Sequence, residues 1–171
     1  MTDARYLVQM HGEPGSGKST LARAIGSGLP AVVIDKDIIS TAFIGGGQAK
    51  GSVGPGSYLA LYGLARSVIE QGFSVVIDSP CYWAEIESNG RGIANATHSR
   101  YLMVETRCAD PGEIDRRLAT RERLESNPIA RQGGPVPGSS EPTCERLVVD
   151  SARPLAEIAC EAIAYIRGVR P

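Results

Sequence analysis

The sequence predicts an α/β fold built on parallel strands. Five short apolar runs alternate with segments that repeat apolar residues at helical spacing. The run at residues 31–34 is wholly apolar, as expected for a parallel strand buried on both faces. With 171 residues the chain is long enough to form one domain with a substantial core.

The predicted elements follow one another with short connections. The strands are expected at residues 6–10, 31–34, 73–77, 100–106 and 146–150. The helices are expected at residues 19–26, 37–43, 57–70, 83–97, 110–124 and 154–167. Ser57 is expected to cap the third helix, and Asn89-Gly90 to interrupt the fourth. The glycine-rich stretch 44–56 is expected to be too flexible to pack, as a mobile loop over a substrate or a plain surface loop.

The first strand leads into a phosphate-binding motif of the form G-x-x-x-x-G-K-[ST]. The motif consists of Gly12, Glu13, Pro14, Gly15, Ser16, Gly17, Lys18 and Ser19. Its glycines allow successive backbone N–H groups to form a concave nest that faces the start of the next helix. Lys18 is expected to contact the β- and γ-phosphates, and the Ser19 hydroxyl to bind Mg²⁺. The motif predicts a nucleotide phosphate site.

Carboxylates follow the second and third strands. Asp35 and Asp37 come directly after the second strand, and Asp78 after the third. Ligands of open α/β sheets gather at the carboxyl ends of the strands, so these groups are placed for chemistry. Asp35 has the alternative role of a helix cap. Ser79 stands where water-activating ATPases have a glutamate, which favours transfer to a bound acceptor over hydrolysis.

Two further segments are candidates for substrate contacts. Tyr82 and Trp83 follow Asp78 closely, and they either wall a pocket or pack the next helix. Arg117 and Arg121 are four residues apart and are expected on one helix face, either solvated or directed at phosphates. Residues 126–145 are rich in Pro, Gly and Ser and are expected to flank a mobile lid.

Composition excludes several classes of protein. The net charge of −1 gives no overall basic field for bulk nucleic-acid binding. The four cysteines show neither metal-ligand spacing nor a disulfide framework, and the two histidines, His11 and His98, are expected to be non-catalytic. Without an apolar leader or a membrane-length apolar stretch, the chain is expected to be cytoplasmic, with no membrane partner.

The order of these motifs resembles the small P-loop kinases. Asp35-Lys36-Asp37 resembles the D-x-D of shikimate and gluconate kinases. Asp78-Ser79, the R-x-x-x-R of Arg117 and Arg121, and Val149-Asp150-Ser151 resemble chloramphenicol phosphotransferase, zeta toxins and polynucleotide kinases. The resemblance implies a doubly wound, five-stranded parallel sheet with helices on both faces, like that of nucleoside monophosphate kinases. Residues 1–171 would form a single domain with a small lid at about residues 112–145.

The same resemblance implies roles for individual residues with ATP and Mg²⁺. Lys18 would contact the β- and γ-phosphates, Asp37 would accept the proton of the acceptor hydroxyl, and Arg121 would bind the transferring phosphate. Ser19 would bind the metal, and Asp35 and Asp78 would orient a water molecule on it. The remaining nucleotide contacts would come from Thr20 beside the motif, from Arg117 near the adenine, and from Ser151 and Arg153 in the loop that contacts the base.

Three functions are compatible with these residues. The leading hypothesis is an ATP-dependent kinase for a hydroxyl of a small molecule such as an antibiotic, a sugar or a nucleoside-like metabolite. A second is a polynucleotide 5′-hydroxyl kinase, in which arginines line a strand path. These are the arginines at 107, 116, 117, 121, 123 and 131. A third is a nucleotide-binding ATPase switch that acts through a partner. The absence of an N-K-x-D motif favours ATP over GTP.

Overall fold

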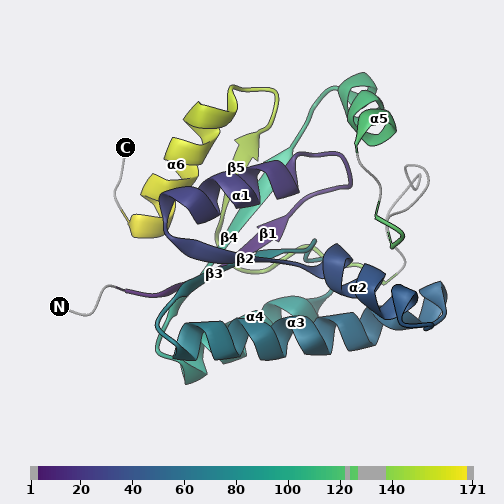
Figure 1. Ribbon diagram of the computed structural model, residues 1–171. Helices are drawn as coiled ribbons and strands as arrows, with labels where there is room; N and C mark the ends of the chain where they lie inside the picture. Colours follow the sequence, from purple (N-terminus) through teal and green to yellow (C-terminus); the bar gives the residue numbers. More distant parts are fainter. Residues whose placement is uncertain (1–3, 122–123, 127–137, 169–171) are drawn as a thin grey trace.

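A computed structural model describes residues 4–121, 124–126 and 138–168 and shows one five-stranded parallel sheet (Figure 1). The strands lie in the order β2-β3-β1-β4-β5, and all four pairings are parallel. Their bounds are β1 (Tyr6–His11), β2 (Ala31–Asp35), β3 (Ser74–Asp78), β4 (Arg100–Arg107) and β5 (Arg146–Asp150). Each predicted apolar run is therefore a strand, which confirms the α/β prediction.

Helices cover both faces of this sheet, as the doubly wound prediction requires. Helices α1 and α6 lie on one face, and α3 and α4 on the other (Figure 1). The bounds are α1 (Lys18–Gly28), α2 (Lys36–Gly45), α3 (Val53–Glu70), α4 (Ala84–Ala96), α5 (Pro111–Thr120) and α6 (Leu155–Arg167), with a short 3₁₀ helix, η1 (Lys50–Ser52). Within the described residues, no helix combines the length and apolar character needed to cross a membrane.

The core has two halves because successive strand residues point to opposite faces of the sheet. On β1, Val8 and Met10 pack with the α1 and α6 side, whereas Leu7 packs with the α3 side. Val76 and Val75 of β3 divide in the same way. Burial on both faces explains the apolar runs of the inner strands β1 and β3. The same expectation is wrong for residues 31–34, because β2 is an edge strand and its Val32 is exposed.

The prediction that residues 44–56 form an unpacked loop is wrong for its second half. Helix α3 begins at Val53, so the glycines beside Pro55 belong to its first turn, where proline is tolerated because the N–H groups have no helical partner. Burial of Val53 anchors this turn. Ser57 consequently lies inside the helix and is not its cap. Its hydroxyl donates to Val53 O at 2.7 Å and accepts from Ser40 Oγ at 2.8 Å.

The predicted interruption of the fourth helix at Asn89-Gly90 is also wrong, since α4 is continuous. A Cβ atom at Gly90 would lie 2.5 Å from Tyr101 Cε2 on the sheet. The glycine is therefore a point of close helix–sheet packing and not a break.

Helix α5 is shorter than the predicted helix 110–124. It ends at Thr120, and Arg121 has an extended backbone with ψ of 145°. Residues 122–123 and 127–137 of the proposed lid lie outside the described residues. Residues 124–126 contact α2, where the Ser126 hydroxyl donates to Asp37 O at 2.9 Å. The lid assignment at about 112–145 stays a prediction.

Candidate active site

The P-loop connects β1 to α1 at the carboxyl edge of the sheet. Gly12, Gly15 and Gly17 have φ values of +128°, +83° and +94°, which L-residues with side chains rarely adopt. The neighbouring strand holds the loop in place, because Ser16 Oγ and Thr106 Oγ1 lie 2.7 Å apart in a buried hydrogen bond. The predicted need for glycine at these positions is confirmed.

The side chain of Lys18 folds back over the P-loop. Its Nζ donates to Gly12 O at 2.7 Å and to Glu13 O at 2.8 Å. Burial lowers the pKa of Lys18 to about 8, although the carboxylates of Asp78 and Asp37 act in the opposite direction. The ammonium group is thus stabilised by the charges of Asp37, the predicted base, and of Asp78, a predicted metal group.

Asp35 and Asp78 occupy matching positions at the ends of the neighbouring strands β2 and β3. Asp78 is buried and accepts a hydrogen bond from the Ser19 hydroxyl. Asp35 caps α2, since its Oδ1 accepts from the backbone N–H of Asp37 at 2.8 Å. Burial raises the pKa of both carboxyls, and the charge of Asp37 raises each further.

These oxygen donors suit a hard divalent cation. Neighbouring carboxylates with raised pKa values are stabilised in their charged form by a bound cation. Within the described residues, no three His, Cys, Asp or Glu side chains are grouped to hold a metal unaided. The set consisting of Ser19, Asp78 and Asp35 therefore fits Mg²⁺, which binds through few protein ligands together with substrate phosphates.

Arg117 and Ser151 meet beside the other end of the P-loop. Arg117 Nη1 donates to Ser151 Oγ at 2.9 Å and Nη2 to Ser151 O at 3.0 Å, while Nε donates to Glu113 at 2.7 Å. A Cβ atom at Gly17 would lie 3.6 Å from Arg117 Nη1. Arg153 is directed elsewhere: its Nη1 donates to Glu161 of α6 at 2.7 Å. The structure brings Arg117 and Ser151 to the motif but not Arg153.

Arg121 lines the cleft with part of its guanidinium unpaired. Its Nε and Nη2 atoms are buried and have no hydrogen-bond partner within the described part of the chain. The group is also close enough to Lys18 to contribute to the lowering of its pKa. Buried donors without partners are costly, and an anion satisfies a guanidinium well. Arg121 is therefore suited to hold a phosphate.

The cleft itself has a volume of about 2150 Å³ and extends from the P-loop to the loop after β3. Asp37 lines it together with Lys36, and the Lys36 Nζ lies 3.1 Å from Asp37 Oδ1. Tyr82 and Trp83 also line it, and Trp83 packs in addition against the cluster that contains Ile86 of α4, so both alternatives for this segment apply. Thr20 is a further lining residue.

Sequence reasoning missed two groups that complete this cleft. Tyr58 lines it from α3, in a segment that was correctly expected to be helical but was not expected to reach the site. Glu105 lies at the end of β4, is buried, and accepts from Arg107 and Arg146 at 2.5 Å each. Burial acts to raise the pKa of Glu105, but these hydrogen bonds outweigh it and lower the pKa. Its place at the carboxyl end of a predicted strand was a signal that could have found it.

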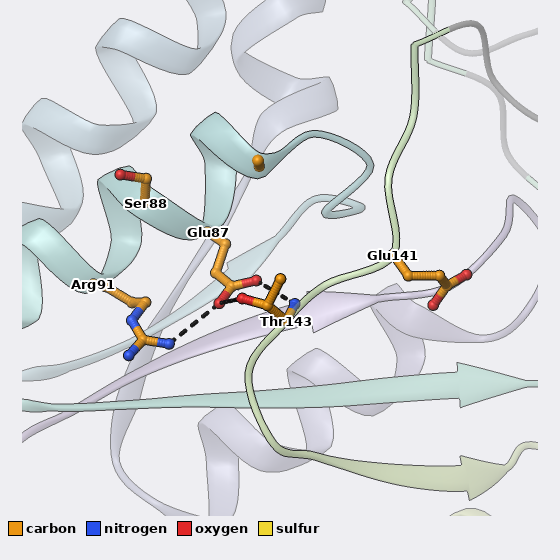
Figure 2. Close-up of a pocket in the computed structure, with 6 residues that line it drawn as sticks. Glu87, Ser88, Arg91, Glu141 and Thr143 are labelled. Atoms are coloured by element: carbon orange, nitrogen blue, oxygen red, sulfur yellow. Dashed lines mark hydrogen bonds and ion pairs between the residues drawn. The ribbon is translucent and has the colours of Figure 1, made fainter.

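Glu87 lines a separate small pocket of about 340 Å³ and holds in place a segment that borders the cleft. It accepts from Thr143 N at 2.7 Å, Thr143 Oγ1 at 2.9 Å and Arg91 Nη1 at 3.2 Å. Figure 2 shows Glu87 and Thr143 facing each other, with Glu141 pointing away from them. Glu141 and the serines before it line the cleft, so Glu87 holds their segment on α4. A glutamate in mid-helix carries no sequence signal for this role.

Neither histidine shows a catalytic geometry. His11 is buried at the end of β1, and its Nδ1 accepts from the backbone N–H of Cys81 at 3.2 Å. Burial lowers the pKa of His11. His98 is exposed just before β4, at the opposite edge of the sheet from the P-loop. His11 also lines the cleft, and the assignment of both histidines as non-catalytic stays a prediction.

Residues 7–132 match the family described as AAA domain. This match includes the P-loop, both carboxylate positions and α5, so it covers most of the chain. The chain belongs to that family. No protein with a curated description matches this chain.

Solved structures show that this AAA-domain chain has the fold of small P-loop kinases. A presumed kinase from Chloroflexus aurantiacus superposes with a TM-score of 0.74 at 17% identity, over 94% of this chain and 97% of that one. The APS kinase of Mycobacterium tuberculosis, solved with AMPPNP and APS, gives 0.70 at 19% identity over 94% and 96%. A gluconokinase from Sinorhizobium meliloti gives 0.60 at 19% identity over 98% and 94%.

Proposed function

We propose that this protein is an ATP-dependent phosphotransferase that moves the γ-phosphate to a hydroxyl group of a small molecule. One observation carries the proposal: Asp37, in the first turn of α2, lines the same cleft as Lys18 of the P-loop, and its negative charge raises the pKa of that lysine. A carboxylate beside the phosphate-binding lysine is suited to accept a proton from an acceptor oxygen.

The nucleotide would be held by the groups that surround the P-loop. The backbone N–H groups of residues 15–19 and the Lys18 ammonium would bind the β- and γ-phosphates. Arg117 and Ser151 would border the base, and the unpaired donors of Arg121 would bind the transferring phosphate. Bound Mg²⁺ would neutralise charge on the phosphate oxygens, and Ser19, Asp78 and Asp35 are the residues that would hold it.

The reaction would be an in-line displacement. The acceptor oxygen forms a bond to the γ-phosphorus while the bond from that phosphorus to the β–γ bridging oxygen breaks, and ADP leaves with the electron pair. The proton of the acceptor hydroxyl passes to Asp37. Positioning and charge stabilisation supply most of the rate in such transfers.

Two features support transfer over hydrolysis. The residue after Asp78 is Ser79, whose hydroxyl donates a hydrogen bond to the Tyr58 hydroxyl at 3.1 Å. Position 79 therefore offers no carboxylate to activate water. The structural neighbours include an APS kinase and a gluconokinase, which are named for small-molecule acceptors.

The polynucleotide alternative receives less support. Of the arginines that could line a strand path, Arg107, Arg116 and Arg117 already pair with glutamates. Arg123 and Arg131 lie outside the described residues.

The test is an ADP-release screen of the purified protein with ATP and Mg²⁺ against hydroxyl-bearing metabolites, antibiotics and 5′-hydroxyl oligonucleotides. The Asp37→Asn variant should lower acceptor-dependent turnover by about 10²–10⁴-fold, because the base is lost while its shape is kept. The matched control is Asp115→Asn, an exposed aspartate on α5, which should retain activity.

The outcomes separate the alternatives. Acceptor-dependent turnover that survives in Asp37→Asn would contradict the assignment of the base. ATP turnover that no acceptor stimulates would favour the switch. Stimulation by oligonucleotides alone, declining steeply with salt, would favour the polynucleotide kinase.

A further inference from the structure

We infer that the acceptor is an uncharged alcohol that carries a planar unsaturated ring, bound against an aromatic wall formed by Tyr58, Tyr82 and Trp83. The inference rests on the proposed function and names the substrate class of the same cleft. All three rings line the cleft and are half-buried, so part of each remains accessible.

Tyr82 borders the point at which phosphate would be transferred. Its hydroxyl donates to Gly12 O at 3.4 Å, and the same carbonyl accepts from Lys18 Nζ at 2.7 Å. The Tyr82 hydroxyl and the Lys18 ammonium therefore meet at the same carbonyl oxygen, which places Tyr82 beside the proposed phosphate site. Arg117 and Ser151, which border the nucleotide, lie at the Gly17 end of the loop instead.

Tyr58 is linked to the proposed base through Lys36. Lys36 Nζ lies 5.7 Å from the centre of the Tyr58 ring and 3.1 Å from Asp37 Oδ1. The Tyr58 hydroxyl accepts a hydrogen bond from Ser79 Oγ, which holds the ring in place. An acceptor hydroxyl placed at Asp37 would thus have its remaining atoms beside the Tyr58 and Tyr82 rings.

Trp83 extends this wall. Its ring centre lies 6.0 Å from that of Tyr82, with the two planes at 88°. His11 supports Tyr82 from behind at 5.8 Å, also edge to face. Such contacts hold the rings in fixed orientations, and flat ligands gain most from surfaces of this kind.

The charges near the wall argue against an anionic acceptor. Lys36 pairs with Asp37, and both Arg107 and Arg146 pair with Glu105. An acceptor carboxylate or phosphate that bound to Lys36 or Arg107 would have to compete with these pairs. An uncharged ring leaves all of them intact.

The experiment uses Trp83, the only tryptophan of the chain, as a fluorescent reporter. The wild-type protein, with Mg²⁺ and AMPPNP, is titrated with 2-phenylethanol, with its saturated counterpart 2-cyclohexylethanol and with gluconate. We expect 2-phenylethanol to bind about three- to tenfold more tightly than 2-cyclohexylethanol, with gluconate weakest. ADP release with ATP and the same three probes should follow the same order.

Variants assign the preference to the wall. Tyr82→Leu should reduce the ratio of the two dissociation constants to about one, since it removes an aromatic face but keeps apolar bulk. Tyr58→Leu provides the same measurement if the first variant unfolds. Tyr165→Leu makes the same change at a half-buried position on α6, outside the cleft, and should keep the full ratio.

The absence of a preference for 2-phenylethanol in the wild type would overturn the inference. Transfer to gluconate or to 2-cyclohexylethanol at an equal or greater rate, lost in Asp37→Asn, would overturn it while leaving the proposed function intact. An aromatic preference in binding without phosphate transfer to any acceptor of the wider screen would contradict the proposed function instead.

Discussion

At the scale of single residues, Lys18 concentrates the chemistry of this site. The lysine is held by two carbonyls of its own loop, and burial lowers its pKa from 10.5 to about 8. A bound phosphate replaces those carbonyls with a full negative charge, which favours the protonated form. The charge state of one side chain is therefore linked to nucleotide binding.

This linkage predicts that ATP binds more weakly as the pH rises above about 8. In the free protein Lys18 loses its proton as the pH passes through its pKa, whereas the complex needs that proton, so binding takes up a proton at high pH. The affinity should fall by about 25-fold between pH 7.5 and 9.5 if the complex keeps the lysine protonated. Calorimetric titration with ATP and Mg²⁺ across this range is the measurement.

The control for this effect is Lys18→Met, which should bind ATP weakly and with little change over the same range. An ATP affinity that stays constant to pH 9.5 in the wild type would contradict the assigned pKa.

At the scale of elements, the start of α2 combines a structural and a chemical role. Asp35 caps the helix, and Asp37 stands in its first turn and lines the cleft. Capping satisfies backbone N–H groups that have no helical partner, and it fixes the direction in which the first turn leaves the strand. The sequence alternatives for Asp35, cap or metal group, are thus compatible with each other.

Two substitutions separate these roles. Asp35→Ala should lower the free energy of unfolding by about 1 kcal/mol, because it removes the cap. Asp35→Asn should keep most of that stability, since asparagine also caps, while it removes the charge that we assign to Mg²⁺. Chemical denaturation and the Mg²⁺ dependence of turnover measure the two effects. Equal stability of Asp35→Ala and the wild type would show that the cap contributes nothing.

Helix α4 offers a second test at this scale, through two glycines with different surroundings. Gly90→Ala should destabilise the protein by about 1–3 kcal/mol, because the added Cβ would lie 2.5 Å from the Tyr101 ring. Gly92→Ala is the matched control: nothing lies within 4 Å of its added Cβ. This second change should stabilise the helix by up to about 1 kcal/mol. Thermal unfolding measures the stability of both variants. Equal stability of Gly90→Ala and Gly92→Ala would contradict the close packing of Gly90 against Tyr101.

At the scale of the whole molecule, two buried glutamates hold the C-terminal third against the rest. Glu87 binds Thr143 to α4, and Glu105 binds Arg146 to β4. Burial alone would raise the pKa of each carboxyl, but the hydrogen bonds from their partners dominate and lower both from 4.5. Each glutamate thus contributes stability in its charged form.

The sign of these pKa shifts predicts a loss of stability in acid. A carboxyl whose pKa is lower in the folded state stabilises the fold above its unfolded value, here about 4.5, and loses this contribution as the pH falls through the folded value. Glu87→Gln should cost about 1–3 kcal/mol at pH 7 and clearly less at pH 3. Urea denaturation of this variant beside Glu85→Gln, an exposed position on α4, measures the difference. An equal cost at both pH values would contradict the role of the charge.

Particular elements show what could be predicted. All five strands were found from their apolar runs, although burial on both faces accounts for these runs only in inner strands such as β1 and β3. The edge strands β2 and β5 have equally apolar runs with exposed valines. The predicted start of α3 is too late, because Gly54, Pro55 and Gly56 have loop propensities that the burial of Val53 overrides. The break at Gly90 was predicted from propensity alone, whereas the neighbouring Tyr101 ring selects glycine there.

The sequence by itself determined the P-loop, the two carboxylate positions and the α/β fold, because each depends on residues close together in the chain. Only the tertiary structure decided which distant groups meet them. It placed Arg117 against Ser151, Glu87 against Thr143, and three aromatic rings from one loop and one helix along one cleft. Contacts between residues far apart in sequence arise from packing of whole elements, and a linear pattern carries no record of that packing.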